Sequence, residues 1–292
     1  MPGHYHKRFS KSGRRANRSR TGTALIVIVV AFFAVFSALP LILMISQAFK
    51  PAGELYLYPP KLFPQNPTLG NFKTLFDVMS NSWVPFSRYL FNTLLIAVAG
   101  TLGNILVSSM AAYPLAKSRA PFVGFLFGMV TLALMFTQLV NDIANYMTMS
   151  ALGWIDTYAA LIVPGMATSF SLFLMRQFMI QIPDDLLSAA RIDGAGEYAI
   201  FFRIVMPNVK PAWLTMALFS FQGLWSVGST PYIYREEMKT MTYALNQIVS
   251  GGLARIGAGA AVTLLMMTVP ILFFILTQSQ IMETMTASGI KE

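Results

Sequence analysis

The sequence contains no cysteine and only two histidines, so several kinds of site are excluded at once. Without cysteine there is no disulfide framework, no thiolate metal site and no cysteine nucleophile. The histidines, His4 and His6, lie in a polar N-terminal tail, where we do not expect a metal site. The phosphate-binding pattern G-x-x-x-x-G-K-[ST] is also missing. If ATP drives this protein, another chain must bind it.

Charged side chains are scarce. They make up 11% of the chain, whereas a soluble domain carries about 25%. Hydrophobic residues make up 55%, a composition that requires a membrane. No carboxylate lies deep inside an apolar run, and Asp142 stands only at the end of one. Proton-coupled carriers usually bury a carboxylate there, and many carriers also show a matched pair of interrupted spans, which we do not find.

Six apolar runs are long enough to be candidate transmembrane spans. They cover residues 23–49, 90–113, 122–140, 158–178, 211–227 and 258–278. The first run is longer than the apolar part of a signal peptide, and no small-residue cleavage site follows it, so we expect it to be retained. We therefore predict an all-α membrane protein with a basic cytoplasmic tail over residues 1–22 and a six-span domain over residues 23–292.

The distribution of basic residues predicts the orientation of these spans. With the N-terminus in the cytoplasm, 14 of the 21 Lys and Arg residues fall in cytoplasmic segments, seven of them in the tail. This asymmetry obeys the positive-inside rule. A basic tail can also bind nucleic acid, but beside a span it is expected to set topology and to contact anionic lipid. We therefore predict membrane lipid, and no nucleic acid, as a partner.

The most distinctive segment is a polar loop of about residues 179–209, between the fourth and fifth spans. Two acidic residues follow Pro183, where the first turn of a helix favours negative charge. A short helix with one apolar face is predicted next, ended by a glycine in the left-handed conformation. The residues that form and close this helix are Asp184, Asp185, Leu186, Leu187, Ser188, Ala189, Ala190, Arg191, Asp193, Gly194 and Ala195.

The spacing within this loop resembles the cytoplasmic signature of bacterial ABC-importer permeases. The matching residues are Ala189, Ala190, Asp193, Gly194, Ala195, Ile204 and Pro207. The signature usually begins with Glu, and Ser188 stands in that position here. The resemblance implies that an external ATPase acts on the 184–194 helix, which would couple ATP hydrolysis to transport. The alternative is an ordinary solvated loop between two spans.

Other segments resemble, in order, the maltose-type carbohydrate-uptake permeases of this group. They lie at residues 40–51, 67–72, 88–93, 110–117, 152–158, 173–178 and 286–291. Segments 230–239 and 243–252 are similar to a branch that imports oligosaccharides cut from plant or other acidic polysaccharides. The sequence departs from the family at Trp225-Ser-Val227, where Trp-Asn-Asp is common.

The resemblance implies a type I ABC importer in a bacterial inner (cytoplasmic) membrane. Its other parts would be a second permease subunit that completes a heterodimer, two ATP-binding subunits that hold ATP and Mg, and an extracytoplasmic sugar-binding protein. This chain would hold no cofactor and catalyse no reaction.

Polar and aromatic residues near the spans are candidates for sugar recognition. Aromatic rings cover the apolar faces of pyranose sugars, and the hydroxyl groups need fixed polar partners. The candidates for the substrate path are Gln222, Trp225, Ser226, Asn141, Asn145 and Tyr146. Gln222 and Trp225 are three residues apart, so they can share one helix face. For each candidate, packing or an interhelical hydrogen bond is the alternative role.

The sequence therefore predicts a permease subunit of an ATP-driven, binding-protein-dependent sugar importer. Two other classes remain open. The first is an ATP-independent carrier or channel, and the second is a membrane scaffold without transport activity. Sugar-stimulated ATPase activity of the chain together with its partners would separate the three classes.

Overall fold

The computed structural model describes residues 20–59, 61–80, 83–136, 138–228, 232–252 and 255–288. Within these residues the chain is helical and contains no strand, as the sequence predicts. The predicted basic tail lies outside the described residues up to residue 19.

In chain order the helices are α1 (Arg20–Phe49), α2 (Ala52–Leu55), α3 (Gly70–Ser80), α4 (Phe86–Lys117), α5 (Val123–Ala133), α6 (Gln138–Ala151), α7 (Ala159–Met166), α8 (Ser169–Ile180), α9 (Asp184–Ile192), α10 (Glu197–Ile200), the π-helical η1 (Phe201–Val205), α11 (Met206–Asn208), α12 (Lys210–Trp225), the 3-10 helix η2 (Glu236–Met238), α13 (Met241–Ser250) and α14 (Ile256–Ser288). The longest connections between helices join α2 to α3 and α12 to η2.

Four segments are long and apolar enough to cross a membrane. They are Thr21–Phe49, Phe86–Lys117, Ala159–Ile180 and Ile256–Gln278, and they correspond to the first, second, fourth and sixth predicted spans. The fifth predicted span forms α12, which has 16 residues. Four of the predicted spans therefore coincide with segments that are long enough to cross a membrane.

The third predicted span differs from the expectation of one continuous helix. Its helical part, α5, has only 11 residues, about 16 Å at 1.5 Å per residue, and α6 begins a separate helix at Gln138. No proline or glycine stands between Ala133 and Gln138. None of the α5 residues is buried. Burial against the rest of the chain therefore gives no reason for the helix to continue beyond Ala133.

The fourth predicted span is also interrupted. It consists of α7 and α8, which are separated at Ala167 and Thr168. Pro164 lies in the last turn of α7, and the Thr168 side chain accepts a hydrogen bond from the Ser171 amide at the start of α8. These two signals are visible in the sequence, but residues 158–178 were predicted as one span from their apolar character alone.

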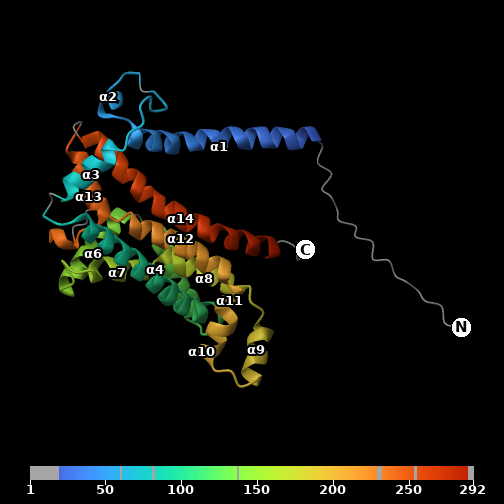
Figure 1. Ribbon diagram of the computed structural model, residues 1–292. Coiled ribbons are helices and arrows are strands. Elements are labelled where there is room, and N and C mark those ends of the chain that lie inside the picture. The colour runs from blue at the N-terminus through green and yellow to red at the C-terminus, as the bar shows by residue number, and fades with distance from the viewer. Residues whose placement is uncertain are drawn as a thin grey trace.

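The helix α4 is at the centre of the bundle and packs against α7, α8 and α12. Within the described residues, the first buried cluster, here called the α9 cluster, joins α4, α8, α9, η1 and α12 and includes Met175, Leu187 and Val205. The second joins α3, α13 and α14, and the third joins α4, α7 and α12 around Trp225. Figure 1 shows α9 and α10 at one end of the bundle and α3 and α13 at the other.

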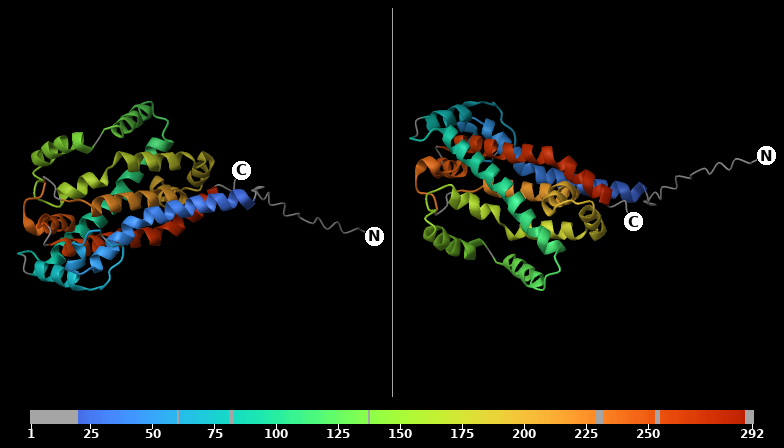
Figure 2. Two further views of the ribbon diagram at one scale, coloured as in Figure 1. Left: turned by 90° about the horizontal axis from the view of Figure 1, so that it is seen from above. Right: turned by 90° about the horizontal axis from the view of Figure 1, so that it is seen from below.

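The helix α1 projects beside the bundle and packs against α14 and α3 (Figures 1 and 2). Most of its side chains are exposed, among them Leu25 and Phe32. A soluble monomer rarely exposes an apolar surface of this length, so lipid or another protein chain must cover it. The start of α1 and the end of α14 point toward the end of the bundle that carries α9 (Figure 2).

Candidate functional site

A helix forms where the sequence predicts one in the polar loop, and it lies beyond the ends of the spans. The helix α9 begins at Asp184 directly after Pro183, with Asp184 and Asp185 in its first turn and Arg191 in its last. Negative charge at the start of a helix and positive charge at its end both favour the helix dipole. Local charge and the proline therefore account for this short helix.

The end of α9 has the geometry predicted for Gly194. This residue has a φ of +83°, in the left-handed region. Its amide donates to the carbonyl of Arg191 (3.1 Å), and the amide of Ala195 donates to the carbonyl of Ala190 (3.0 Å). This pair of bonds satisfies carbonyl groups that would otherwise be free at a helix end, and it requires a residue that tolerates positive φ.

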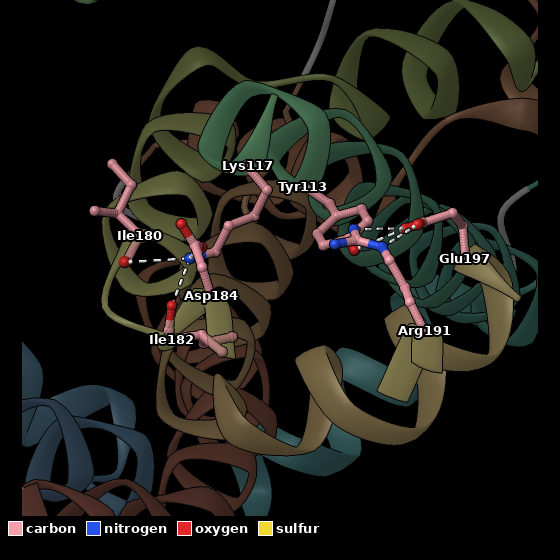
Figure 3. A network of polar contacts seen from close by, with 7 residues as sticks. All are labelled: Tyr113, Lys117, Ile180, Ile182, Asp184, Arg191 and Glu197. Carbon is pink, nitrogen blue, oxygen red and sulfur yellow. Dashed lines mark hydrogen bonds and ion pairs between the residues drawn. The ribbon is translucent and has the colours of Figure 1, made fainter. Parts of the chain in front are cut away.

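Lys117, at the end of α4, holds the start of α9. Its ammonium group donates to the Asp184 carboxylate at 2.8 Å and also to the carbonyls of Ile182 and Ile180 (Figure 3). The Lys117 side chain is only 10% exposed, whereas that of Asp184 is 67% exposed. The lysine is therefore the buried partner, and it fixes the chain just before α9 against the second span.

A second contact from α4 holds the end of α9. Arg191 forms an ion pair with Glu197 at 2.7 Å, and the Tyr113 hydroxyl donates to the other oxygen of the same carboxylate at 3.0 Å (Figure 3). Tyr113 lies four residues, about one turn, before Lys117 on α4. One end of a single span thus contacts the start of α9 directly and its end through Glu197 of α10.

The two sides of α9 have different surroundings. Leu187 is 1% exposed and packs into the α9 cluster. The opposite side, here called the α9 surface, consists of the exposed residues Asp185, Leu186, Ser188, Ala189 and Ile192.

Two aromatic residues that follow α9, Tyr198 and Phe202, are exposed as well. Exposed aromatic and large apolar side chains that lie together are typical of a surface that another protein contacts.

The ion pairs at both ends of α9 lower the pKa of their carboxyl groups. The hydrogen bond and charge of Lys117 hold the pKa of Asp184 below its ordinary value. Arg191, and then Tyr113, hold the pKa of Glu197 below its ordinary value. Because both values fall on folding, the ion pairs contribute to the attachment of α9 above the ordinary carboxyl range, and the contribution is lost as pH falls through the lowered values.

We therefore expect the attachment of α9 to be constant at neutral pH and to weaken only below about pH 4, the ordinary range of carboxyl groups. A spin label on Ala189→Cys, in this cysteine-free chain, would report the weakened attachment of α9 as increased mobility of the label at acidic pH. Asp184→Asn should increase the mobility at neutral pH, whereas Asp185→Asn should not, because Asp185 takes part in neither ion pair. Equal mobility from pH 7 to pH 3 would contradict this assignment.

The structure separates the predicted substrate-path residues on α12. Trp225 is 2% exposed, its ring stacks on Phe221, and its indole N–H donates to the Met266 carbonyl at 2.9 Å. Gln222 and Ser226 are exposed. In this conformation Gln222 is accessible and Trp225 is not, so the two side chains do not present one accessible face. Trp225 packs between α12 and α14, and its place in the substrate path stays a prediction.

The predicted residues on α6 lie near two tyrosines that the sequence analysis did not select. The Tyr146 hydroxyl is 3.1 Å from that of Tyr234, and the Tyr146 ring stacks on Tyr232. Asn141 is exposed and Asn145 is half-buried on the same helix. The pattern Tyr232-Ile-Tyr234 was a usable signal, because aromatic rings are the side chains that cover the apolar faces of pyranose sugars.

An ion pair fixes this tyrosine-bearing segment. Asp156 pairs with Arg235 at 2.6 Å and accepts hydrogen bonds from the backbone amides of Tyr234 and Arg235.

A buried asparagine of α4, Asn92, binds the backbone that follows this segment. Asn92 donates to the carbonyls of Glu237 and Lys239 and accepts a hydrogen bond from Tyr158. Within the described residues, no group of three His, Cys, Asp or Glu side chains could hold a metal ion.

Two relatives match nearly the whole chain. The arabinooligosaccharides transport system permease protein AraQ of Halalkalibacterium halodurans is 28% identical, over 91% of this chain and 96% of its own length. The sn-glycerol-3-phosphate transport system permease protein UgpE of Pectobacterium atrosepticum is 30% identical, over 87% of this chain and 91% of its own length.

The fold is shared with a solved ABC importer. A chain from the crystal structure of a bacterial ABC transporter involved in the import of the acidic polysaccharide alginate has a TM-score of 0.75. The match covers 90% of this chain and 98% of that chain, at 19% sequence identity. Residues 13–283 match the family model of the binding-protein-dependent transport system inner membrane component. The chain therefore belongs to this family of ABC-transporter permeases.

Proposed function

We propose that this chain is the permease subunit of an ATP-driven, binding-protein-dependent importer of oligosaccharides, and that α9 is its coupling helix. The observation that carries the proposal is the two-sided environment of α9. One side is attached to the spans through Leu187, Lys117 and Glu197, while the α9 surface is left free for a partner. A helix attached in this way can transmit a movement of its partner to the bundle.

The proposed partners divide the work of transport. Two ATP-binding subunits would hold ATP and Mg, because the chain itself has no phosphate-binding loop. They would also contact the α9 surface. A second permease would complete the pathway, and an extracytoplasmic binding protein would deliver the sugar. Closure of the ATPase pair would displace α9 and open the pathway outward, and ATP hydrolysis would reset it.

The proposal includes six passages through a bacterial inner membrane. They are α1, α4, the α5–α6 pair, the α7–α8 pair, α12 and α14. Arg191, Arg203 and Lys117 lie around α9, the end that we assign to the cytoplasm. The start of α1 points to the same end (Figure 2), which supports a cytoplasmic N-terminus.

A cysteine label tests this orientation. Ser12→Cys should be shielded from a membrane-impermeant thiol reagent in intact cells, whereas Ser80→Cys, at the end of α3, should be labelled. Replacing the seven basic residues of the tail by Gln should give a fraction of molecules with the tail outside. Labelling of position 12 in intact cells, with the natural tail, would contradict the assignment of both sides.

We propose that the substrate is an oligosaccharide released from a plant or other acidic polysaccharide. AraQ, which is named for arabinooligosaccharides, supports this class, whereas UgpE is named for sn-glycerol-3-phosphate. The candidates for contact with it are the accessible ones: Gln222 and Ser226 on α12, and Asn141, Asn145 and Tyr146 on α6 with Tyr232 and Tyr234 beside them. An exposed amide and a group of aromatic rings fit hydroxyl groups and pyranose faces.

A pair of α12 variants separates recognition from packing. Gln222→Leu should raise the KM of transport about two- to tenfold, because a lost hydrogen bond costs about 0.5–1.5 kcal/mol, and should leave thermal stability unchanged. Trp225→Phe loses the bond to the Met266 carbonyl and part of a buried ring, so it should lower stability and leave KM unchanged. An unchanged KM in Gln222→Leu would assign sugar recognition to other residues or to the second permease.

Reconstitution tests the function as a whole. The chain, assembled with its second permease, ATP-binding subunits and binding protein in vesicles, should hydrolyse ATP faster when the oligosaccharide is added, and uptake should need ATP. Uptake that persists without the ATP-binding subunits would support an ATP-independent carrier or channel. Assembly without any uptake would support a scaffold.

A further inference from the structure

A row of buried polar side chains runs along one side of α4. Thr101, Asn104 and Ser108 are spaced by three and four residues, which places them on one helix face. They are 6%, 0% and 2% exposed. Thr101 Oγ1, Asn104 Oδ1 and Ser108 Oγ, together with Ser220 Oγ on α12, are buried atoms without a hydrogen-bond partner in the described part of the chain.

The Asn104 side chain places this row at the interruption of the fourth span. Its amide nitrogen donates to the carbonyl of Gly165 in α7 (3.0 Å) and to the Thr168 hydroxyl (3.3 Å), which caps α8. The unpartnered oxygen of Asn104 belongs to the same amide group. It therefore lies beside the point where α7 ends and α8 begins.

Packing places Ser220 at the same level. Leu224 lies against Gly100 and Gly165, so closely that a Cβ added to these glycines would be 2.4 and 2.8 Å from Leu224 methyl groups. The helix α4 runs toward α9, whereas α12 runs away from it (Figure 1). Ser220 precedes Leu224 by one turn, and Asn104 follows Gly100 by one turn. The two unpartnered groups consequently lie at the same level of the α4–α12 contact.

Such a group of atoms needs a ligand that can both donate and accept. Each polar group left unpartnered within the hydrocarbon layer costs several kcal/mol in free energy. An amide oxygen only accepts, and a hydroxyl group both donates and accepts. Buried water typically makes about three hydrogen bonds to groups of this kind. No charged side chain is part of the row, so nothing in it favours an ion over a neutral ligand.

We propose that internal water is bound at the interruption between α7 and α8, held by Asn104 and by the hydroxyl groups of Thr101, Ser108 and Ser220. Water can exchange one hydrogen-bond partner for another at little cost, unlike a direct bond between two helices. The bound water would therefore allow α8, which leads directly into α9, to change its angle to α4 and α7. The water site itself does not depend on the proposed transport function.

Radiolytic labelling with pulsed X-rays in ¹⁸O water can detect such water in the full-length chain in membranes. Hydroxyl radicals form from ordered water and oxidise the side chains beside it. Leu224 and Leu214 are a matched pair, because both lie on α12 and both are 7% exposed. Leu224 should be oxidised several-fold faster than Leu214. Equal rates for the two would overturn the proposal.

Variants distinguish bound water from water that enters at the membrane surface. Asn104→Leu should reduce the oxidation of Leu224 to the rate of Leu214. The milder Ser108→Ala and Ser220→Ala, which remove one hydroxyl group each, should reduce it partly and keep the test valid if Asn104→Leu fails to fold. Fast oxidation of Leu224 that is unchanged in all variants would assign the label to bulk water and overturn the site.

Discussion

Gly194→Val should abolish most transport while the chain still inserts into the membrane at a normal level. Gly194 has a φ of +83°, where a β-branched residue is strained by about 1–3 kcal/mol. No atom lies within 4 Å of a Cβ added there, so the effect comes from the backbone and not from a clash. The end of α9 would unwind, and the bonds to the carbonyls of Ala190 and Arg191 would be lost.

The measurements are uptake into cells and recovery of the ATP-binding subunits with the purified chain. Both should fall about tenfold or more, since each 1.4 kcal/mol corresponds to a factor of ten. Gly194→Asn is the control, because Asn tolerates the left-handed conformation. This variant should retain most of the uptake and most of the recovered ATP-binding subunits. If the Val variant transports normally, the end of α9 has no part in coupling.

Substitutions of two neighbouring leucines on α9 should have different effects. Leu187→Ala removes a side chain that is 1% exposed, and such a change costs about 2–5 kcal/mol. We expect α9 to detach from the α9 cluster. Leu186 is 43% exposed on the α9 surface, so Leu186→Ala should leave the attachment unchanged and weaken the contact with the ATP-binding subunit.

Proteolysis and binding measure the two effects separately. Leu187→Ala should speed cleavage in residues 184–200 of the chain alone by at least tenfold. Leu186→Ala should be cleaved at the normal rate but should bind the ATP-binding subunit several-fold more weakly. Slow cleavage of Leu187→Ala would mean that the ion pairs at Lys117 and Arg191 hold α9 without its buried leucine. Normal binding by Leu186→Ala would place the partner elsewhere.

The parts of the site that the sequence predicts are those set by neighbours in the chain. The start of α9 follows from Pro183, Asp184 and Asp185, and its end follows from Gly194. The contacts that attach α9 to α4 could not be predicted in this way. Lys117 and Asp184 are 67 residues apart, and only the packing of the second span against the fourth brings them together.

The errors in the predicted spans have a related cause. Hydrophobic length does not show where a helix is interrupted, so residues 122–140 were expected to form one span, although the helix ends at Ala133. The roles on α12 were also undecided in the sequence. A spacing of three residues allows Gln222 and Trp225 to share a face, but the position of α14 decides that Trp225 is buried.

The length of α4 has a consequence for communication between the two sides of the membrane. Its 32 residues extend about 48 Å. Near its first turns, Asn92 binds the backbone of Glu237 and Lys239, and near its last turns Tyr113 and Lys117 hold α9. If α4 moves as one body, the energetic influence is mutual. A ligand that shifts the 237–239 segment then changes the affinity of the chain for its ATP-binding subunit by a certain factor. Binding of the ATP-binding subunit changes the affinity of the chain for that ligand by the same factor.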